Sequence, residues 1–550
     1  MQIKVEERFL QTRLISSLEK VFCDEECIAK EFKNGSMLLN ERYSFQLAFM
    51  LEGERLDDVN ISINSPLQEY ISVRLVESVP SQMPCYHNCD ENVLRTTPGL
   101  YPDVLVDMPK YNLRLLNKQW RSVWITIDPK CNVKAGNYEI EVCLNEKDKN
   151  LTKDIFTIEI INAKLPEQQL IHTQWFHADC IATYYKLDVF SEEHWEKLEQ
   201  FIKVAGDYGI NMILTPIFTP ALDTEVGKER PTVQLVDVIK NGDNYTFKFD
   251  KLKRFFDICF KNNIKYFEYS PLFTQWGSKF TPKIVAEENG QLKRIFGWDT
   301  LAKSQEYENF LNQFLPKFVE FLKEQNLQEN SWFHISDEPS LDDLENYEFC
   351  YNLISKYIKD FPIFDALSNY EFYEKGFVKY PVVASDHIEP FIENNVKDLW
   401  TYYCCGQQID VANCFFNMPS HRNRILGMQL YKYNIKGFLH WGYNFWYSQF
   451  SRYEIDPYLV SDAGCGFPSG DAYMVYPSKD GVNVSLRLEV LYDVLQDLRA
   501  LQLLESKIGK QEILNIIEKE CEITFKQYKH CSEWLLNTRK TINNLIKENL

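Results

Sequence analysis

Short runs rich in β-branched and aromatic residues fill the chain from about residue 36 to residue 162. Among them are YSFQLAFML, EYISVRLVE, SVWITI, GNYEIEVCL and DIFTIEII, each bounded by turn residues. Runs of this length with alternating apolar positions are typical of half-buried strands. They predict an N-terminal antiparallel β-sandwich domain over residues 1–165. The proline-containing segment NAKLPEQQL (162–170) is the expected linker.

After this linker, apolar runs alternate with amphipathic helices. In one helix Phe310, Phe314 and Phe318 recur at every fourth position. The eight apolar runs are 171–177, 210–216, 264–270, 331–336, 362–366, 381–385, 398–403 and 436–441. Eight strand–helix units predict a (β/α)8 TIM-type catalytic barrel over residues 166–484, with an open doubly wound sheet as the alternative. Residues 485–550 form a C-terminal helical segment in this prediction.

Two loops in the predicted barrel are unusually long. Residues 219–250 follow the second strand and contain a predicted hairpin, TVQLVDV against NYTFKF, and residues 273–299 follow the third strand. Loops that follow barrel strands lie on the C-terminal face, where barrel enzymes build their sites. We therefore expect both loops to border a site.

The composition narrows the range of partners. The 550 residues contain 60 Lys and Arg against 79 Asp and Glu, a net charge of −19. This charge repels nucleic-acid phosphates and anionic lipid head groups. The first residues, MQIKVEERFL, lack a basic start before an apolar run, and no apolar segment reaches the roughly 18 to 20 residues that span a bilayer. We expect a cytoplasmic protein without membrane insertion or nucleic acid, and its oligomeric state is left open.

The fifteen cysteines are scattered through apolar segments, which predicts reduced thiols. Two pairs, Cys23 with Cys27 and Cys85 with Cys89, have spacings that a four-thiolate zinc site could use. The first pair also fits the apolar face of a helix, and the second lies in a segment rich in Pro, Ser and Asn. We therefore predict no metal.

The segment SWFHISDEPS (331–340) places two carboxylates, Asp337 and Glu338, at the end of the fourth predicted strand. Strand alternation would send adjacent side chains to opposite faces. Pro339 cannot donate a ladder hydrogen bond, so pairing should stop there, and a bulge could turn both carboxylates into one cavity. The same residues also suit a helix start, with Asp337 or Ser340 as the cap.

Polar and aromatic residues gather at the same end of most predicted strands. Flat aromatic faces combined with carboxylates and amides suit a sugar, which stacks through its C–H face and needs paired hydrogen bonds. Each aromatic residue taken singly also suits a core position. The candidate substrate-binding residues are His177, Asp179, Trp276, His334, Asp386, His387, Tyr403, Trp441, Tyr443 and Asn444.

Neighbouring carboxylates restrict the possible mechanisms of sugar hydrolysis. Ordinary retaining and inverting glycosidases place their two carboxylates on opposite sides of the scissile bond. Adjacent acids fit substrate-assisted hydrolysis better, in which the 2-acetamido oxygen of the sugar attacks the anomeric carbon. Asp337 would orient the acetamide, and Glu338 would act as general acid and then as general base. An ionised Asp337 and partial burial should raise the pKa of Glu338.

Several separated segments together resemble one family. These segments, PGLYPDVL, WFHADC, HISDEP, HWGYNFW and GDAYMVYP, resemble glycoside hydrolase family 123 and its uncharacterised relatives in the same order and over nearly the whole chain. The resemblance implies a β-sandwich, a (β/α)8 barrel and retaining N-acetyl-β-galactosaminidase activity by the acetamido-assisted route. It implies Asp337 and Glu338 as the catalytic pair, and no metal or organic cofactor.

Three other interpretations stay open at this stage. The sugar could be another β-linked 2-acetamido sugar such as N-acetylglucosamine. The barrel could bind carbohydrate without cleaving it, although a pure binder has no need for a protonated glutamate beside an ionised aspartate. A metal-dependent hydrolase using His177, Asp179, His334 and Asp337 is disfavoured, because neither HxxDE nor HAD matches an established ligand spacing.

Overall fold

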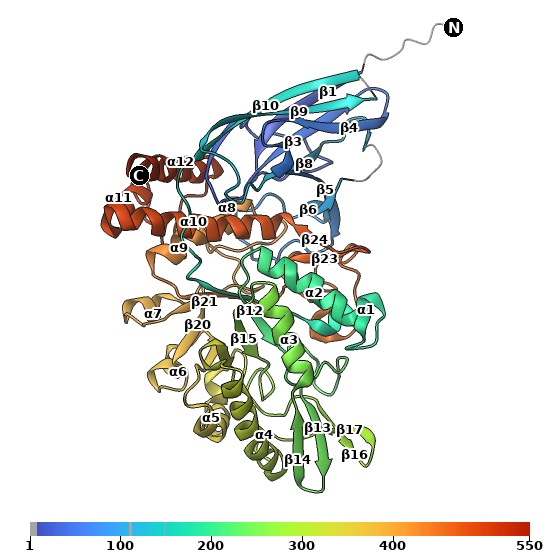
Figure 1. Ribbon diagram of the computed structural model, residues 1–550, viewed down its shortest axis with the longest axis vertical. Helices are drawn as coiled ribbons and strands as arrows, with labels where there is room; N and C mark the ends of the chain where they lie inside the picture. The colour runs from blue at the N-terminus through green and yellow to red at the C-terminus, as the bar shows by residue number, and fades with distance from the viewer. Residues whose placement is uncertain (1–7, 109–112, 148) are drawn as a thin grey trace. The chain divides into compact units, whose positions relative to one another are not determined.

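The computed structural model describes residues 8–108, 113–147 and 149–550. The chain forms two compact units, each built from separate stretches of sequence (Figure 1). The first contains the residues up to Gln168 together with Ala412–Lys432 and Asn483–Leu550, and the second contains Gln169–Val411 and Tyr433–Val482. The division into three consecutive domains at residues 165 and 484 stays a prediction.

The first unit contains two β-sheets that share one hydrophobic core. One sheet includes, in this order, β1 (Phe9–Ser16), β3 (Tyr43–Glu52), β8 (Arg121–Ile127), β5 (Ile71–Ser81), β6 (Gly99–Asp107) and β24 (Val482–Ser485). The other has the order β2 (Asn34–Leu38), β10 (Lys149–Ile161), β9 (Gly136–Glu146), β4 (Leu56–Asn64) and β7 (Leu113–Leu115). Neighbouring strands are antiparallel except β10 and β2, which are parallel.

Both sheets contribute fully buried side chains to this core. Phe45 of the first sheet stacks on Phe156 of the second, with ring centroids 4.0 Å apart, and both belong to one cluster with Val123 and Ile140. Each such side chain contributes about 1.5–3 kcal/mol on burial. The predicted N-terminal antiparallel sheet domain is confirmed.

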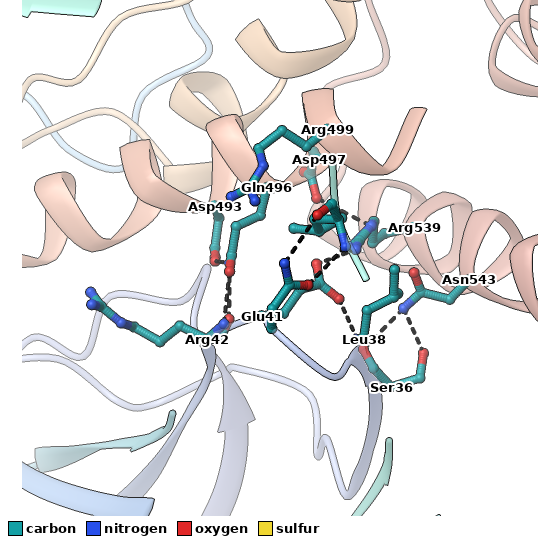
Figure 2. A network of polar contacts seen from close by, with 12 residues as sticks. Ser36, Leu38, Glu41, Arg42, Asp493, Gln496, Asp497, Arg499, Arg539 and Asn543 are labelled. Carbon is teal, nitrogen blue, oxygen red and sulfur yellow. Dashed lines mark hydrogen bonds and ion pairs between the residues drawn. The ribbon is translucent and has the colours of Figure 1, made fainter. Parts of the chain in front are cut away.

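The remaining helices of the first unit lie outside the strand-rich part of the sequence. They are α8 (Ser420–Arg424), α9 (Leu426–Lys432), α10 (Leu486–Ile508), α11 (Lys510–Ile517) and α12 (Ser532–Glu548). Figure 2 shows polar contacts between α10, α12 and the β2–β3 region. Arg539 pairs with Glu41, and Asn543 Nδ2 donates to Ser36 O at 3.0 Å. Gln496 Nε2 donates to Arg42 O at 2.9 Å. These contacts fix α10 and α12 to the N-terminal sheet domain.

The second unit is built around a parallel eight-stranded sheet. Its order is β18 (Ser331–Phe333), β15 (Tyr266–Tyr269), β12 (Met212–Thr215), β11 (Ile171–Gln174), β22 (Gly437–His440), β21 (Trp400–Tyr402), β20 (Tyr380–Ala384) and β19 (Phe364–Leu367). Phe333 also forms a parallel bridge to Ile363, and its N–H donates to Pro362 O at 3.0 Å. This bridge nearly closes the sheet into a barrel. Each of the eight predicted barrel strands overlaps one of these strands.

Helices follow most of these strands, as the alternation of patterns predicts. They are α1 (Ala178–Tyr185), α2 (Glu192–Asp207), α3 (Asp250–Lys261), α4 (Gln305–Glu324), α5 (Leu344–Ile358), α6 (Tyr370–Glu374) and α7 (Glu389–Glu393). The three phenylalanines singled out in α4 are all fully buried. Among the described helices, none has the length and apolar character that crossing a bilayer requires.

The two long loops form one small sheet together. Its order is β14 (Asn244–Lys248), β13 (Asp237–Asn241), β16 (Ile284–Glu288) and β17 (Gln291–Phe296), so the predicted hairpin is joined by strands of the second loop. The first hairpin strand begins later than TVQLVDV suggests. The Leu235 N–H instead donates to Pro216 O at 3.0 Å, because this stretch packs along the end of β12.

Candidate active site

The chain leaves the strand before it reaches the two adjacent carboxylates. β18 ends at Phe333, and Glu338 adopts a left-handed backbone conformation with φ of 43°. A non-glycine residue takes this conformation rarely, so the surroundings must hold it. The Glu338 N–H donates to Ala366 O at 3.1 Å, and the Trp276 N–H donates to Asp337 O at 3.1 Å. Because strand alternation has ended, both carboxylates reach the same pocket.

This pocket has a volume of about 130 Å³ and lies entirely within the second unit. It is lined by Trp175, His177, Leu222, Asp223, Gln275, Trp276, Asp337, Glu338, Ala366, Tyr402, Cys404, Cys405, Leu439, Trp441 and Phe467. Its walls are mainly apolar and aromatic, with a few polar groups among them, which is the usual make-up of a small-molecule site.

Burial controls the protonation of the Asp337–Glu338 pair. Burial and then repulsion from Glu338 hold the pKa of Asp337 well above its ordinary value. Burial also raises the pKa of Glu338, against a hydrogen bond from Tyr402, whose hydroxyl donates to Oε1 at 2.5 Å. The nearby charge of Asp471 raises it further. The surroundings of the two neighbouring carboxyls therefore favour the protonated form of each.

A second buried cluster lies directly before the pair in sequence. His334 Nε2 contacts Glu268 Oε1 at 2.5 Å, and Nδ1 contacts Asp365 Oδ1 at 2.8 Å. Burial opposes the imidazolium charge, but the two carboxylates overcome it and raise the pKa of His334 to about 10. Trp175 Nε1 donates to Glu268 Oε1 at 2.6 Å, and the Tyr347 hydroxyl donates to Asp365. His334 therefore holds the end of β18 in place and does not itself line the pocket.

Comparison with known proteins now decides the family. The sequence profile of "Glycoside hydrolase 123, catalytic domain" matches residues 175–504, more than half of the chain. The chain belongs to glycoside hydrolase family 123. It is therefore a glycoside hydrolase. No curated protein matches the chain.

Solved structures include a relative of similar length. A family 123 glycoside hydrolase from Clostridium perfringens is 17% identical, with a TM-score of 0.72, over 98% of this chain and 97% of that chain. A family 39 glycoside hydrolase from Bacteroides cellulosilyticus WH2 is 10% identical over 80% of this chain and 81% of that chain, with a TM-score of 0.35. The first likeness shows that the whole hydrolase shares the fold of the Clostridium enzyme.

His177 lines the pocket of the hydrolase and is fixed by its neighbours. Arg230 donates to Asp179 Oδ1 at 2.7 Å and contacts His177 Nδ1 at 3.2 Å. Burial, and then the Arg230 charge, lower the pKa of His177 to about 3, so the ring is neutral and its Nε2 donates to Trp441 O at 3.1 Å. Asn444 bonds both the N–H and the C=O of His177. Asp179 and Asn444 therefore position His177 and do not line the pocket.

The other predicted substrate-binding residues divide into two groups. Trp276 and Trp441 line the pocket; Trp276 is 45% exposed, and Trp441 Nε1 donates to Asp471 Oδ2 at 2.9 Å. The residues outside the pocket lining are His334, Asp386, His387, Tyr403 and Tyr443. Tyr443 donates its hydroxyl to Phe201 O at 2.9 Å, and Tyr403 packs edge-on against Phe438 and His440. Asp386 accepts from Gln407 Nε2 at 2.9 Å and from the largely exposed His387.

Sequence reasoning missed several pocket residues of the hydrolase. Tyr402 and Tyr403 both stand at the end of the seventh predicted strand, and the predicted set contains Tyr403, whereas Tyr402 lines the pocket and donates its hydroxyl to Glu338. Trp175 lies two positions before His177 and shares its strand-end face, which was a usable signal. Asp223 and Gln275 lie in the long loops, where no periodicity fixes the direction of a side chain.

The described residues hold no group of three or more His, Cys, Asp or Glu side chains that could bind a metal ion. All fifteen cysteines lie in the described ranges, and none of them forms a disulfide bond.

Proposed function

We propose that the protein is a retaining exo-glycosidase that releases terminal β-linked N-acetylgalactosamine with the help of the sugar's own 2-acetamido group. The main observation in support is that two sequence-adjacent carboxyls, both with raised pKa, line one small pocket. Adjacent side chains are poorly suited to flank a scissile bond from opposite sides. The acetamido oxygen would therefore be the nucleophile, and the anomeric configuration would be retained.

The two carboxyls would share one proton, and substrate would decide its place. In the empty pocket, burial favours the proton on Asp337, whose pKa is raised well above its ordinary value. An acetamide N–H that donates to Asp337 stabilises the ionised form, so the proton moves to Glu338. Glu338 then protonates the leaving oxygen and later deprotonates water, while ionised Asp337 stabilises the oxazolinium charge.

The size and lining of the pocket support removal of one terminal sugar. A volume of about 130 Å³ is small for a ligand site and suits one ring better than a longer chain. Trp175, Trp276 and Trp441 offer flat apolar faces for the C–H side of that ring. The Clostridium relative hydrolyses glycolipid glycans, which suggests a glycoconjugate as the substrate here. We also infer that the nearly closed eight-stranded sheet is a TIM-type barrel.

Activity on aryl β-glycosides tests this proposal directly. The wild-type protein should cleave the N-acetylgalactosaminide faster than the N-acetylglucosaminide, and Asp337→Asn and Glu338→Gln should abolish most turnover of both. Glu345→Gln is the matched control, because Glu345 is an almost fully exposed carboxylate on α5. Turnover that survives both pocket substitutions would overturn the assignment. Saturable binding without turnover would favour the non-catalytic carbohydrate-binding alternative.

A further inference from the structure

The two long loops meet at one wall of the pocket through Asp223 and Gln275. Asp223 follows β12 and Gln275 follows β15, and both side chains line the pocket. The Asp223 N–H donates to Gln275 Oε1 at 2.8 Å. Neither residue belongs to the catalytic pair or to the clusters around His177 and His334. They bring two additional polar groups to the sugar site.

The contact with Asp223 fixes the orientation of the Gln275 amide. A backbone N–H can only donate, so its partner must be the amide oxygen, and the amide nitrogen Nε2 is the other terminal atom. Gln275 is 6% exposed, and its Nε2 has no hydrogen-bond partner among the described residues. A buried donor without an acceptor costs about 1–3 kcal/mol. An arriving ligand that supplies an oxygen removes this penalty.

Asp223 supplies the matching acceptor on a rigid backbone. Its φ of 40° lies in the left-handed region, where a non-glycine residue must be held by its surroundings. The Phe450 N–H donates to Oδ2 at 2.9 Å, and Ser451 Oγ donates to the Asp223 carbonyl at 2.7 Å. A carboxylate can accept further hydrogen bonds, including at Oδ1. Burial raises the pKa of Asp223 to about 6, so the group is mostly an acceptor at neutral pH.

We propose that Gln275 and Asp223 together select one hydroxyl of the bound sugar ring, with Gln275 Nε2 donating to that hydroxyl and Asp223 accepting from it. This proposal rests on the proposed function, since it assigns substrate recognition to the same pocket. A hydroxyl both donates and accepts, so one such group satisfies the pair. A sugar without this hydroxyl, or with it in the other configuration, leaves the Gln275 donor unpaired in a buried site, which opposes its binding.

The test measures kcat/KM for the wild type and for pocket variants on a parent glycoside and on its deoxy analogues, as in a double-mutant cycle. The substrates are the aryl 2-acetamido β-glycoside and its 3-, 4- and 6-deoxy analogues, and the key variant is Gln275→Met, which keeps the length of the side chain but removes the donor. For the wild type, kcat/KM should fall by about tenfold or more on one analogue, in line with loss of roughly 1.4 kcal/mol of hydrogen bonding. The kcat/KM of Gln275→Met on the parent glycoside should be lower than that of the wild type by a similar factor. Its kcat/KM should fall little further on that analogue.

Two further variants separate recognition from loop structure. Asp223→Asn removes the charge of the acceptor while keeping its shape. It should lower kcat/KM on the parent glycoside and show little further loss on the same deoxy analogue. Ser451→Ala loosens the Asp223 backbone but leaves both pocket groups, so any loss should be uniform across the four substrates. Equal losses of Gln275→Met on all four substrates would overturn the proposal and leave the pair a loop contact only. A glycosyl group found covalently attached to Asp223 by mass spectrometry would also overturn it.

Binding measurements separate this proposal from the proposed function. Glu338→Gln and the double variant Glu338→Gln/Gln275→Met are titrated by calorimetry with N-acetylgalactosamine and its three deoxy analogues. The affinity loss on the one selected analogue should be large for Glu338→Gln and small for the double variant. Coupling in binding together with an inactive wild type would contradict the proposed hydrolysis but keep the hydroxyl recognition. Wild-type turnover without coupling in either measurement would keep the hydrolysis and overturn the recognition pair.

Discussion

Two acidic clusters lie near the end of β18 in this hydrolase, and they differ in solvent exposure and in whether they contain a cation. In the first, Glu268 and Asp365 enclose His334, whose pKa rises to about 10. In the second, Asp337 and Glu338 face a pocket, and no cation contacts either carboxyl by the ion-pair distances of the described residues. The side chains of the first cluster are fully buried, whereas Asp337 is partly exposed and Glu338 is exposed.

The difference shows how neighbouring carboxyls can serve either structure or chemistry. A buried cation between carboxylates fixes their charges and their geometry. Neighbouring carboxyls without a cation have raised pKa values, so a substrate can shift the proton between them. The first cluster holds the end of β18, and the second would exchange protons with the sugar.

Substitutions in the pocket pair should change activity most and stability least. Glu338→Gln should lower kcat/KM by about 10²–10⁴-fold, the usual share of general acid–base catalysis, and Asp337→Asn should lower it by about 10²–10³-fold. Because each variant removes a carboxyl that has a raised pKa and no cationic partner among the described residues, the thermal midpoint should stay or rise. Steady-state kinetics and calorimetric unfolding check both parts. A clearly lower midpoint would mean that the pair is structural.

Removal of the cation from the other cluster should reverse this pattern. His334→Gln leaves Glu268 and Asp365 buried without their counter-charge, and breaking such a buried pair costs about 3–5 kcal/mol. Denaturant unfolding should show this loss of stability. A matched control is His387→Gln, which changes a largely exposed ring with one carboxylate partner and should leave stability within about 0.5 kcal/mol. Equal stability of the two variants would contradict the structural role of His334.

The pH dependence of stability should separate the clusters in a finer way. The pKa of His334 rises from 6.5 to about 10 on folding, so its stabilisation is complete below pH 6.5 and is lost as pH rises towards 10. The stability of the wild type should therefore exceed that of His334→Gln by the largest amount below pH 6.5. The pKa of Asp337 also rises from 3.8, so its ionisation weakens folding once pH exceeds about 4. The stability of Asp337→Asn should rise relative to that of the wild type above that pH. Thermal unfolding across pH 4–10 measures this, and a constant difference between the two midpoints would contradict it.

The smallest effect is expected at Tyr402. Its hydroxyl donates to Glu338 and lowers the pKa of that carboxyl against the effect of burial. Tyr402→Phe should raise the pKa of Glu338 further, which moves the alkaline limb of the kcat/KM profile to higher pH and changes the maximal rate by less than about tenfold. An alkaline limb that stays in place or moves to lower pH would contradict this contact.

Much of the barrel could be predicted because its strands are buried on both faces and leave continuous apolar runs. The eight runs each overlap a strand of the eight-stranded sheet. The small sheet that joins the two long loops was not predictable, because β13 and β16 are distant in sequence and pair through one parallel bridge. Local patterning carries no information about such a pairing.

The candidate site was predictable only where chemistry and strand position agreed. Asp337 and Glu338 stood out because adjacent acids contradict strand alternation, and the left-handed φ of Glu338 is the physical reason that both reach one pocket. Asp179 and His334 looked like ligands because they are polar strand-end residues. Each proves to be paired within the protein, Asp179 with Arg230 and His334 with two carboxylates. A sequence does not show which polar groups satisfy one another.

The nucleophilicity of the substrate's acetamido group offers the most direct test of the mechanism. The measurement is kcat/KM for aryl glycosides whose N-acetyl methyl group carries none, one, two or three fluorine atoms. If the acetamido oxygen attacks the anomeric carbon, each fluorine withdraws electrons and the rate should fall steeply along the series. A rate that is nearly independent of fluorination, or equal turnover of 2-hydroxy sugars, would contradict substrate assistance and point to a nucleophile from the protein.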